Sequence, residues 1–298
     1  MKKKSFMVLL LVFVWTGMQA QNLVHVSEIE ERNVEGKKKI YSGEEKLNGV
    51  VYEDFVVKKL RYSVINGVKE GPYELYYPNG KLKRKTNFKN DKYDGSFEEY
   101  YDNGQLSIKT SFQEGRYDGP LIRYYRNGAI QAKGYHREGK FEGAQETYYP
   151  NGQLKSGIAY LEGKKHGLSV KYYENGNLKE KSQSADDVLE GPYEHYYEDL
   201  TLYVRSNYKV GVKDGDFEMY YENGRLKRKG YYKEGKEAGP FEIYYPNGVL
   251  KRKGFFEAGR LHGESESYDE NGQLINRSTF KNGQEISSKK TVISFKKA

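Results

Sequence analysis

The sequence has no cysteine, little proline and almost no tryptophan. None of its 298 residues is Cys, which excludes disulfide bonds, thiolate zinc sites and cysteine nucleophiles. Only 7 residues are Pro, and the single Trp is Trp15. A mean hydropathy of -0.93 excludes a chain made of transmembrane helices. The 30 Tyr and 33 Gly are abundant, and an aromatic content of 15% is too high for a disordered chain. The composition predicts a Tyr- and Gly-rich, all-β protein.

Long apolar runs are also missing, except at the start of the chain. Lys2, Lys3 and Lys4 precede an apolar run from Phe6 to Trp15, and a small residue follows at Ala20. This is the pattern of a secretory signal peptide over residues 1–20, with cleavage after Ala20. The alternative is a retained membrane anchor, which the short run disfavours because a spanning helix needs about 20 residues. We therefore expect a periplasmic or secreted protein.

The rest of the chain is dominated by a repeat of 24 residues. Asn-Gly recurs in this register from Asn79 to Asn271, with one gap at Asp199-Leu200, and Tyr-Tyr recurs from Tyr76-Tyr77 to Tyr244-Tyr245. The predicted organisation is a charged, irregular lead-in over 21–46 in which one strand could form, a degenerate repeat over 47–70, nine repeats over 71–286, and a tail over 287–298.

Each repeat is predicted to form a β-hairpin. Two β-prone runs flank Asn79-Gly80, and Asn-Gly between such runs favours a two-residue type I′ turn. A second turn, such as Glu114-Gly115, leads into the next hairpin. The predicted fold is an elongated, single-layer antiparallel array of β-hairpins. With this turn, one face is packed and the other is exposed. The packed face carries Tyr73, Tyr77, Leu82 and Phe88, and the exposed face carries Glu74, Tyr76, Lys83 and Lys85.

Three turns depart from the pattern. Asp91 and Asp187 replace the second-turn glycine, and we expect both turns to be kept because Asp tolerates the left-handed conformation. Leu200 replaces the glycine of Asn-Gly, and a different loop is expected there, with a bend in the array.

The exposed face carries two recurrent features. The first is a ladder of Glu opposite Lys or Arg, which we interpret as a register-setting, self-neutralising device worth about 0.2–1 kcal/mol per pair. The second is a tyrosine stripe, for which two interpretations stay open: it covers lysine stems and bridges strands, or it binds a ligand or partner. The stripe, and thus the candidate partner-binding set, is Tyr76, Tyr100, Tyr124, Tyr148, Tyr172, Tyr196, Tyr220, Tyr244 and Tyr268.

The repeats resemble the MORN repeat, in the variant found in bacterial proteins of the YwqK antitoxin family. The matching pattern is Gly-x-Phe/Tyr-Glu-x-Tyr-Tyr-x-Asn-Gly-x-Leu-Lys, followed by a turn such as Gly235-Lys236-Glu237-Ala238-Gly239. The resemblance covers residues 71–286. It implies an elongated twisted sheet that serves as a scaffold for protein contacts, and some members are linked to membranes or phospholipids. The antitoxin name implies a toxin as partner.

No enzyme motif is evident, and we expect neither a cofactor nor a metal site. Gly134 to Lys140 and Gly230 to Lys236 look like phosphate loops, but Phe141 and Glu237 stand where Ser or Thr is required. The five His are scattered without metal-ligand spacing.

Two functions agree with these observations. The first is an exported, non-catalytic scaffold for an unidentified protein or peptide, in the manner of an antitoxin or immunity protein. The second is a module that binds cell-wall carbohydrate, against which stands the loss of the only Trp with the signal peptide. A net charge of +8, three of it in the signal peptide, favours neither nucleic acid nor a membrane surface as partner. The sequence does not predict the oligomeric state.

Overall fold

The computed structural model describes residues 22–54 and 59–290. The chain divides into two compact units, residues 1–96 and 97–298, and each is described by itself. The predicted signal peptide lies outside the described residues, and so does the tail from residue 291.

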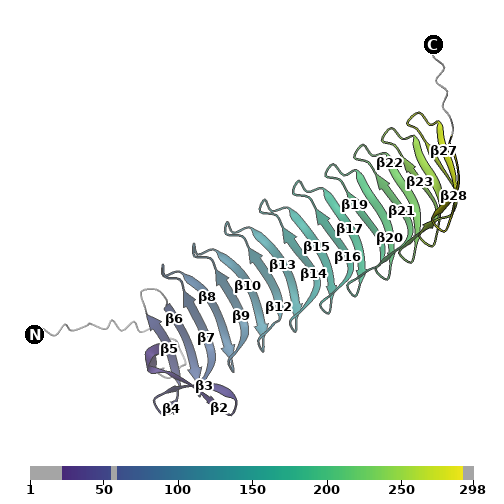
Figure 1. Cartoon of the computed structure of the whole chain (residues 1–298). Helices are drawn as coiled ribbons and strands as arrows, with labels where there is room; N and C mark the ends of the chain where they lie inside the picture. The colour runs from purple at the N-terminus through teal and green to yellow at the C-terminus, as the bar shows by residue number, and fades with distance from the viewer. Residues whose placement is uncertain (1–21, 55–58, 291–298) are drawn as a thin grey trace, which may run out of the picture. The chain divides into compact units, whose positions relative to one another are not determined.

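The first unit contains a small sheet and the start of the hairpin array (Figure 1). Strands β2, β3 and β4 form a three-stranded antiparallel sheet, while β1 pairs in parallel with β5 and the next strands run antiparallel. Its elements are β1 (Leu23–His25), the 3-10 helix η1 (Val26–Glu28), β2 (Glu30–Val34), β3 (Lys37–Ser42), β4 (Glu45–Lys46), β5 (Gly49–Asp54), β6 (Lys59–Ile65), β7 (Val68–Tyr76), β8 (Leu82–Lys89) and β9 (Lys92–Tyr100), which contains the division between the units.

The second unit is an uninterrupted antiparallel meander, whose hairpins lie side by side in Figure 1. The predicted all-β array of hairpins is confirmed. Its strands are β10 (Leu106–Gln113), β11 (Arg116–Tyr117), β12 (Gly119–Tyr124), β13 (Ile130–Arg137), β14 (Lys140–Tyr148), β15 (Leu154–Leu161), β16 (Lys164–Tyr172), β17 (Leu178–Ala185), β18 (Val188–Leu189), β19 (Gly191–Tyr196), β20 (Leu202–Lys209), β21 (Val212–Tyr220), β22 (Leu226–Lys233), β23 (Lys236–Tyr244), β24 (Leu250–Glu257), β25 (Arg260–Leu261), β26 (Gly263–Tyr268), β27 (Leu274–Lys281) and β28 (Gln284–Lys290).

The N-terminal lead-in contains more structure than the single strand expected there. Strands β1 to β4 all precede the degenerate repeat. A cluster of buried side chains joins them to the first hairpins: Val24, Ile40, Leu47, Val51, Tyr62 and Val64. The irregular spacing of these residues gave no sign of strands, but burying them against β5 and β6 provides the apolar core that a single hairpin lacks.

The turn at Asn-Gly differs from the predicted type I′ turn. Gly80 has a φ of +82°, whereas Asn79 is not in the left-handed region. The Gly80 N–H donates to the Tyr77 carbonyl at 2.9 Å, and the Tyr77 N–H donates to the Lys81 carbonyl at 2.8 Å. Pro78 and Asn79 are thus the centre of a type I turn, and Gly80 follows as a left-handed bulge residue. The Asn79 side-chain oxygen accepts from the Lys81 N–H at 3.0 Å, which explains the recurrence of Asn.

This longer turn shifts the predicted pairing by one residue at the hairpin end. A two-residue turn at Asn79-Gly80 would pair Glu74 with Lys85 and Tyr76 with Lys83. Glu74 does pair with Lys85, but Tyr76 faces Leu82 because the register shifts between Leu75 and Tyr76. Lys83 instead lies with its ammonium 5.4 Å from the centroid of the Tyr77 ring. The predicted faces are therefore correct for the inner part of each strand. For Leu82 and Lys83 they were wrong, and these two residues exchange sides.

The two-residue type I′ turns occur instead at the second turn of each repeat. Arg137 pairs with Lys140, and between them Glu138 and Gly139 have φ values of +50° and +83°. Asp91 (φ +62°) and Asp187 (φ +69°) adopt the same conformation as the glycines they replace. The prediction that Asp keeps these turns is confirmed.

Leu200 was expected to change its loop, and it does not. It adopts a φ of +71°, and its N–H donates to the Tyr197 carbonyl at 3.1 Å, as the glycines do in the other repeats. Asp199 takes the place of Asn, because its carboxylate accepts from the Thr201 N–H at 2.9 Å. Pairing on both sides fixes the turn, so a leucine is held in a conformation that disfavours a Cβ.

Replacing Leu200 with Gly is expected to stabilise the protein. The left-handed conformation costs a non-glycine residue about 1–2 kcal/mol, and the leucine side chain is 50% exposed and loses little packing. We expect a gain of about 1 kcal/mol in the free energy of unfolding, measured by urea denaturation. Leu200→Ala keeps the Cβ and is the control, with no such gain. An equal gain in both variants would show that the side chain, and not the backbone conformation, is unfavourable.

The packed face carries a row of aromatic rings, as predicted for Tyr73 and Phe88. In the first unit Tyr73 contacts Phe88 at 5.5 Å between ring centroids, and in the second unit Phe241 contacts Phe256 at 4.7 Å. Register shifts occur on both sides of a strand, as in β14, and such bulges bend a strand locally. The hairpins are curved in Figure 1. Phe241 is only 4% exposed although the sheet has a single layer.

Small residues opposite the rings make this burial possible. Gly254 faces Phe241, and a Cβ on Gly254 would lie 2.7 Å from a Phe241 ring atom. Thr86 and Ser206 occupy the corresponding position in other repeats and are each 2% exposed. The Phe241 ring therefore lies over the backbone of the neighbouring strand, and this contact buries the ring without a second layer of structure.

Candidate functional site

The tyrosine face is the face of the sheet that carries the tyrosine stripe, with Tyr76 in the first unit and the other eight tyrosines in the second. All nine are half-buried. In seven repeats the hydroxyl donates to the glutamate two residues earlier, which alternation places on the same face. These pairs are Tyr76 with Glu74 at 2.8 Å, Tyr100 with Glu98 at 2.7 Å, Tyr196 with Glu194 at 2.8 Å, Tyr220 with Glu218 at 2.9 Å, and Tyr148, Tyr244 and Tyr268 with Glu146, Glu242 and Glu266.

These contacts keep the hydroxyls protonated. Burial, followed by the hydrogen bond to the glutamate, raises the pKa of Tyr76 and that of Tyr100 to about 12 each. The hydroxyls are therefore hydrogen-bond donors at neutral pH and are already bound to a carboxylate. A stripe tyrosine beside a glutamate presents mainly its ring to a partner.

The basic residues of the ladder connect neighbouring repeats as well as the strands of one hairpin. Lys133 contacts Glu146 of the following repeat at 2.8 Å, and Lys229 contacts Glu242 at 2.7 Å. Arg205 contacts Glu194 in its own hairpin at 3.2 Å and Glu218 in the next at 3.5 Å. The sequence predicted the pairs within hairpins, whereas the structure adds pairs between repeats. Since the basic side chains are about half exposed, each pair contributes little alone, and the network acts by fixing the register.

Glu266 is the most heavily bonded carboxylate of the ladder. It accepts from the Tyr268 hydroxyl and contacts Lys253 at 2.8 Å and Arg277 at 2.6 Å. The residue is only 8% exposed. The bond from Lys253, with those from Tyr268 and Arg277, lowers the pKa of the Glu266 carboxyl to about 2.

The second tyrosine of each Tyr-Tyr pair has a role that the sequence analysis missed. The Tyr125 hydroxyl donates to the backbone carbonyl of Tyr148 at 2.7 Å, and the Tyr149 hydroxyl donates to that of Tyr172 at 2.9 Å. The same bond over 23 residues recurs from Tyr101, Tyr173, Tyr197, Tyr221 and Tyr245. It joins the end of one hairpin to the next. The constant Tyr-Tyr spacing was the signal that could have suggested a structural role.

The charged ladder is interrupted at two positions of the tyrosine face. Ile122 and Val170 occupy the place of the glutamate, facing Lys133 and Lys181 across the strands. The hydroxyls of Tyr124 and Tyr172 consequently have no carboxylate acceptor two residues earlier. The repeat register identifies both positions in the sequence, where Ile122 and Val170 stand in place of the recurrent glutamate.

The stretch of the tyrosine face around these gaps carries more exposed apolar side chains and is here called the central patch, although one ladder pair, Lys133 with Glu146, lies between the gaps. On the same side of the sheet, Ile130, Tyr135 and Leu168 are 40%, 41% and 45% exposed. Val170 faces Gly157 on the neighbouring strand, where an added Cβ would lie 3.4 Å from Val170 Cγ2. The central patch consists of Pro120, Ile122, Tyr124, Ile130, Tyr135, Ala144, Tyr148, Leu168, Val170 and Tyr172.

A protein-family model identifies the type of repeat that forms this array. The model described as MORN repeat variant matches residues 69–90, 93–114, 141–156, 165–186, 213–234, 238–258 and 261–282. These seven segments are MORN variant repeats. The stretches 115–140 and 187–212, which the model does not match, keep the 24-residue register of the array and form the same hairpins. One gap in the ladder, Ile122, falls in the first of them.

The other comparisons add no functional information. No curated protein matches the chain. Among solved structures, the chain is similar to part of one described as "Crystal Structure of TcdB2-TccC3-Cdc42", with 12% identity and a TM-score of 0.17. The match covers 74% of this chain and 13% of that chain. At this TM-score the likeness carries no argument.

Among residues 22–54 and 59–290, no three His, Asp or Glu side chains are grouped so that they could hold a metal ion. Across these residues no helix has the length and apolar character needed to cross a membrane.

Proposed function

We propose that this protein is an exported, non-catalytic MORN-type scaffold that binds a protein or peptide partner on its tyrosine face. The repeats support the scaffold, and the N-terminal sequence over residues 1–20 supports export to the periplasm or beyond the cell. The observation that carries the proposal is the central patch. There an otherwise charged face loses two glutamates and presents exposed aromatic and aliphatic side chains instead.

The spacing of the patch suits an extended segment of a partner. Adjacent strands lie about 4.8 Å apart, so Tyr124 and Tyr172, two repeats apart, are separated by about 19 Å. About six residues of extended chain span this distance, at about 3.3 Å per residue. Rigid rings without a carboxylate beside them provide contact area at low entropic cost. Lys181 is exposed and faces Val170, so an acidic side chain of the partner would complete the interrupted ladder.

A narrower form of the proposal is that the partner is a toxin that this protein neutralises. It is supported by the resemblance of the repeats to those of proteins labelled as antitoxins. The central patch is compatible with this role but does not require it.

The test restores the missing glutamates. Ile122→Glu with Val170→Glu returns both positions to the residue found in seven other repeats, opposite Lys133 and Lys181, so the fold is expected to be retained. In a crosslinking pull-down from cell-envelope extract with residues 21–298, we expect this variant to lose a protein that the unmodified chain captures. Lys227→Gln with Lys251→Gln is the control, because it changes the net charge equally on distant repeats and should retain capture.

Two outcomes would contradict the proposal. Equal capture of the partner by both variants would show that the central patch is not part of the interface. Retention on purified wall polysaccharide without capture of a protein would favour carbohydrate binding instead.

A further inference from the structure

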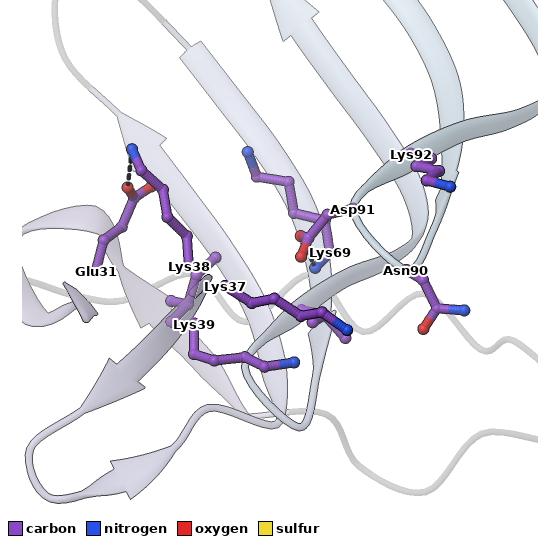
Figure 2. A pocket seen from close by; sticks show the side chains of 10 residues that line it. Glu31, Lys37, Lys38, Lys39, Lys69, Asn90, Asp91 and Lys92 are labelled. Carbon is purple, nitrogen blue, oxygen red and sulfur yellow. Dashed lines mark hydrogen bonds and ion pairs between the residues drawn. The ribbon is translucent and has the colours of Figure 1, made fainter. Parts of the chain in front are cut away.

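The first unit contains a hollow that is separate from the tyrosine face. It has a volume of ≈ 750 Å³ and lies between β3, the start of β7 and the turn from β8 to β9 (Figure 2). Five lysines line it: Lys37, Lys38, Lys39, Lys69 and Lys92. The size is within the usual range of small-molecule sites, about 300–1,000 Å³. Its lining is unusual in being mainly cationic.

The fold holds the two sides of the hollow in fixed positions. On one side, Ile40 is 4% exposed in the core, and its N–H donates to the Gly67 carbonyl at 2.7 Å, which ties β3 to the turn before β7. On the other side, the Asp91 carboxylate accepts from the Lys69 N–H at 2.7 Å, and the Asp91 N–H donates to the Lys69 carbonyl at 3.1 Å. The Asn90 N–H donates to Glu70 at 2.9 Å. The lysines are therefore carried by restrained backbone.

Only part of this positive charge is balanced. Glu31 contacts Lys38 at 3.3 Å, and the other carboxylate of the lining, Asp91, is bound to the backbone of Lys69. The Lys69 ammonium lies 5.4 Å from the Tyr62 ring centroid and 5.6 Å from that of Phe88, so aromatic rings hold it in place.

Three lysines remain without a counter-charge. Lys37, Lys39 and Lys92 have no ion pair within the part of the chain that the structure describes. Lys37 and Lys39 lie two residues apart on β3, and Figure 2 shows their side chains running in the same direction, toward the Asn90–Asp91 turn. Like charges gathered around one hollow repel each other and create a local positive potential. A bound anion would relieve this repulsion.

We infer that this hollow binds a compact anion that carries several phosphate groups. Flexible ammonium groups on a wet, open surface bind a single charge weakly because solvent and salt screen each contact. A ligand with linked phosphates can reach Lys37 and Lys39, which run in the same direction, and extend to Lys92 beyond the turn, and lysine is a common point-charge partner of phosphate. The site is independent of the proposed partner-binding face, so either proposal can fail without the other.

Inorganic tripolyphosphate is the probe for this inference, with binding to residues 21–298 measured by calorimetry at about 50 mM salt. We expect Lys37→Gln, Lys39→Gln and Lys92→Gln together to weaken binding at least tenfold, with unchanged circular dichroism. The matched control is Lys227→Gln, Lys251→Gln and Lys281→Gln, which removes the same charge from exposed positions of the second unit. This control should bind as the unmodified chain does.

Three results would overturn the inference. They are the absence of binding by the unmodified chain, an equal loss in the two triple variants, and binding of citrate, a carboxylate anion of comparable size, as tight as that of tripolyphosphate. The first two would show that the lysines form no site, and the third would show that the site does not select phosphate.

Discussion

Replacing Phe241 with Ala is expected to lower the free energy of unfolding by about 3–5 kcal/mol, the usual cost of removing a buried phenylalanine ring. Phe241 is 4% exposed, packs on Phe256 at 4.7 Å between centroids, and covers Gly254 on the adjacent strand. No second layer could fill the space that the ring would leave. Urea unfolding followed by circular dichroism measures the loss.

Phe255 provides the matched control, because it lies one residue away from Phe256 on the same strand and projects to the tyrosine face. It faces Pro240 and is 45% exposed. Phe255→Ala is expected to cost less than about 1 kcal/mol. If both variants lost the same stability, the assignment of the packed and exposed faces would be wrong.

A strong dependence on pH is expected at Glu266. The hydrogen bonds from Lys253, Tyr268 and Arg277 hold its pKa at about 2 in the folded protein, against about 4.3 in an unfolded chain. A carboxyl group with a depressed pKa stabilises the fold above its unfolded value, and the stabilisation is lost as the pH falls toward the folded value. Glu266→Gln should therefore cost about 1–3 kcal/mol at pH 7, and the difference from the unmodified chain should shrink from about pH 4.5 to pH 2.

Glu242→Gln is the comparison for this experiment. The pKa of Glu242 is also lowered, against the effect of its burial, by bonds from Lys229 and Tyr244, but the side chain is 32% exposed. A smaller loss is expected at this more exposed position. A stability difference for Glu266→Gln that stays constant from pH 7 to pH 2 would contradict the assigned role of the carboxylate charge.

Much of the fold follows from the repeat period, because a hairpin every 24 residues leaves few alternatives to an antiparallel meander. The turns were harder to predict. Asn-Gly fits both a type I′ turn and a type I turn with a left-handed glycine, and Pro78, with the side-chain bond of Asn79, selects the second. Leu200 follows the same turn because the pairing of β19 and β20 outweighs the preference of a single residue.

The lead-in shows a different limit. Its strands are stabilised by contacts between residues far apart in the sequence, such as those of Ile40 with Gly67 and with Leu47. No local periodicity therefore predicts these strands. Local sequence patterns predict the elements that repeat. The core of the lead-in is formed by residues that do not repeat, and it can be identified only when the tertiary structure is known.

For the candidate site, the sequence predicted the positions of the stripe but not the bonding of its hydroxyls. Alternation already placed Tyr148 beside Glu146, and thus could have identified their hydrogen bond. The bond from Tyr125 to the carbonyl of Tyr148 depends on the offset between hairpins, which the sequence does not give. The two gaps at Ile122 and Val170 were visible in the register, and their meaning became clear with the exposed side chains around them.

The most direct test of the account is to locate the partner on the sheet by photo-crosslinking. A photoreactive phenylalanine analogue would be placed at Tyr124 and Tyr172 on the central patch, and at Tyr160 and Tyr208 on the face with the aromatic row. We expect crosslinks to one protein from the first pair and none from the second. Crosslinks from Tyr160 and Tyr208 alone would contradict it, because the partner would then bind the opposite face.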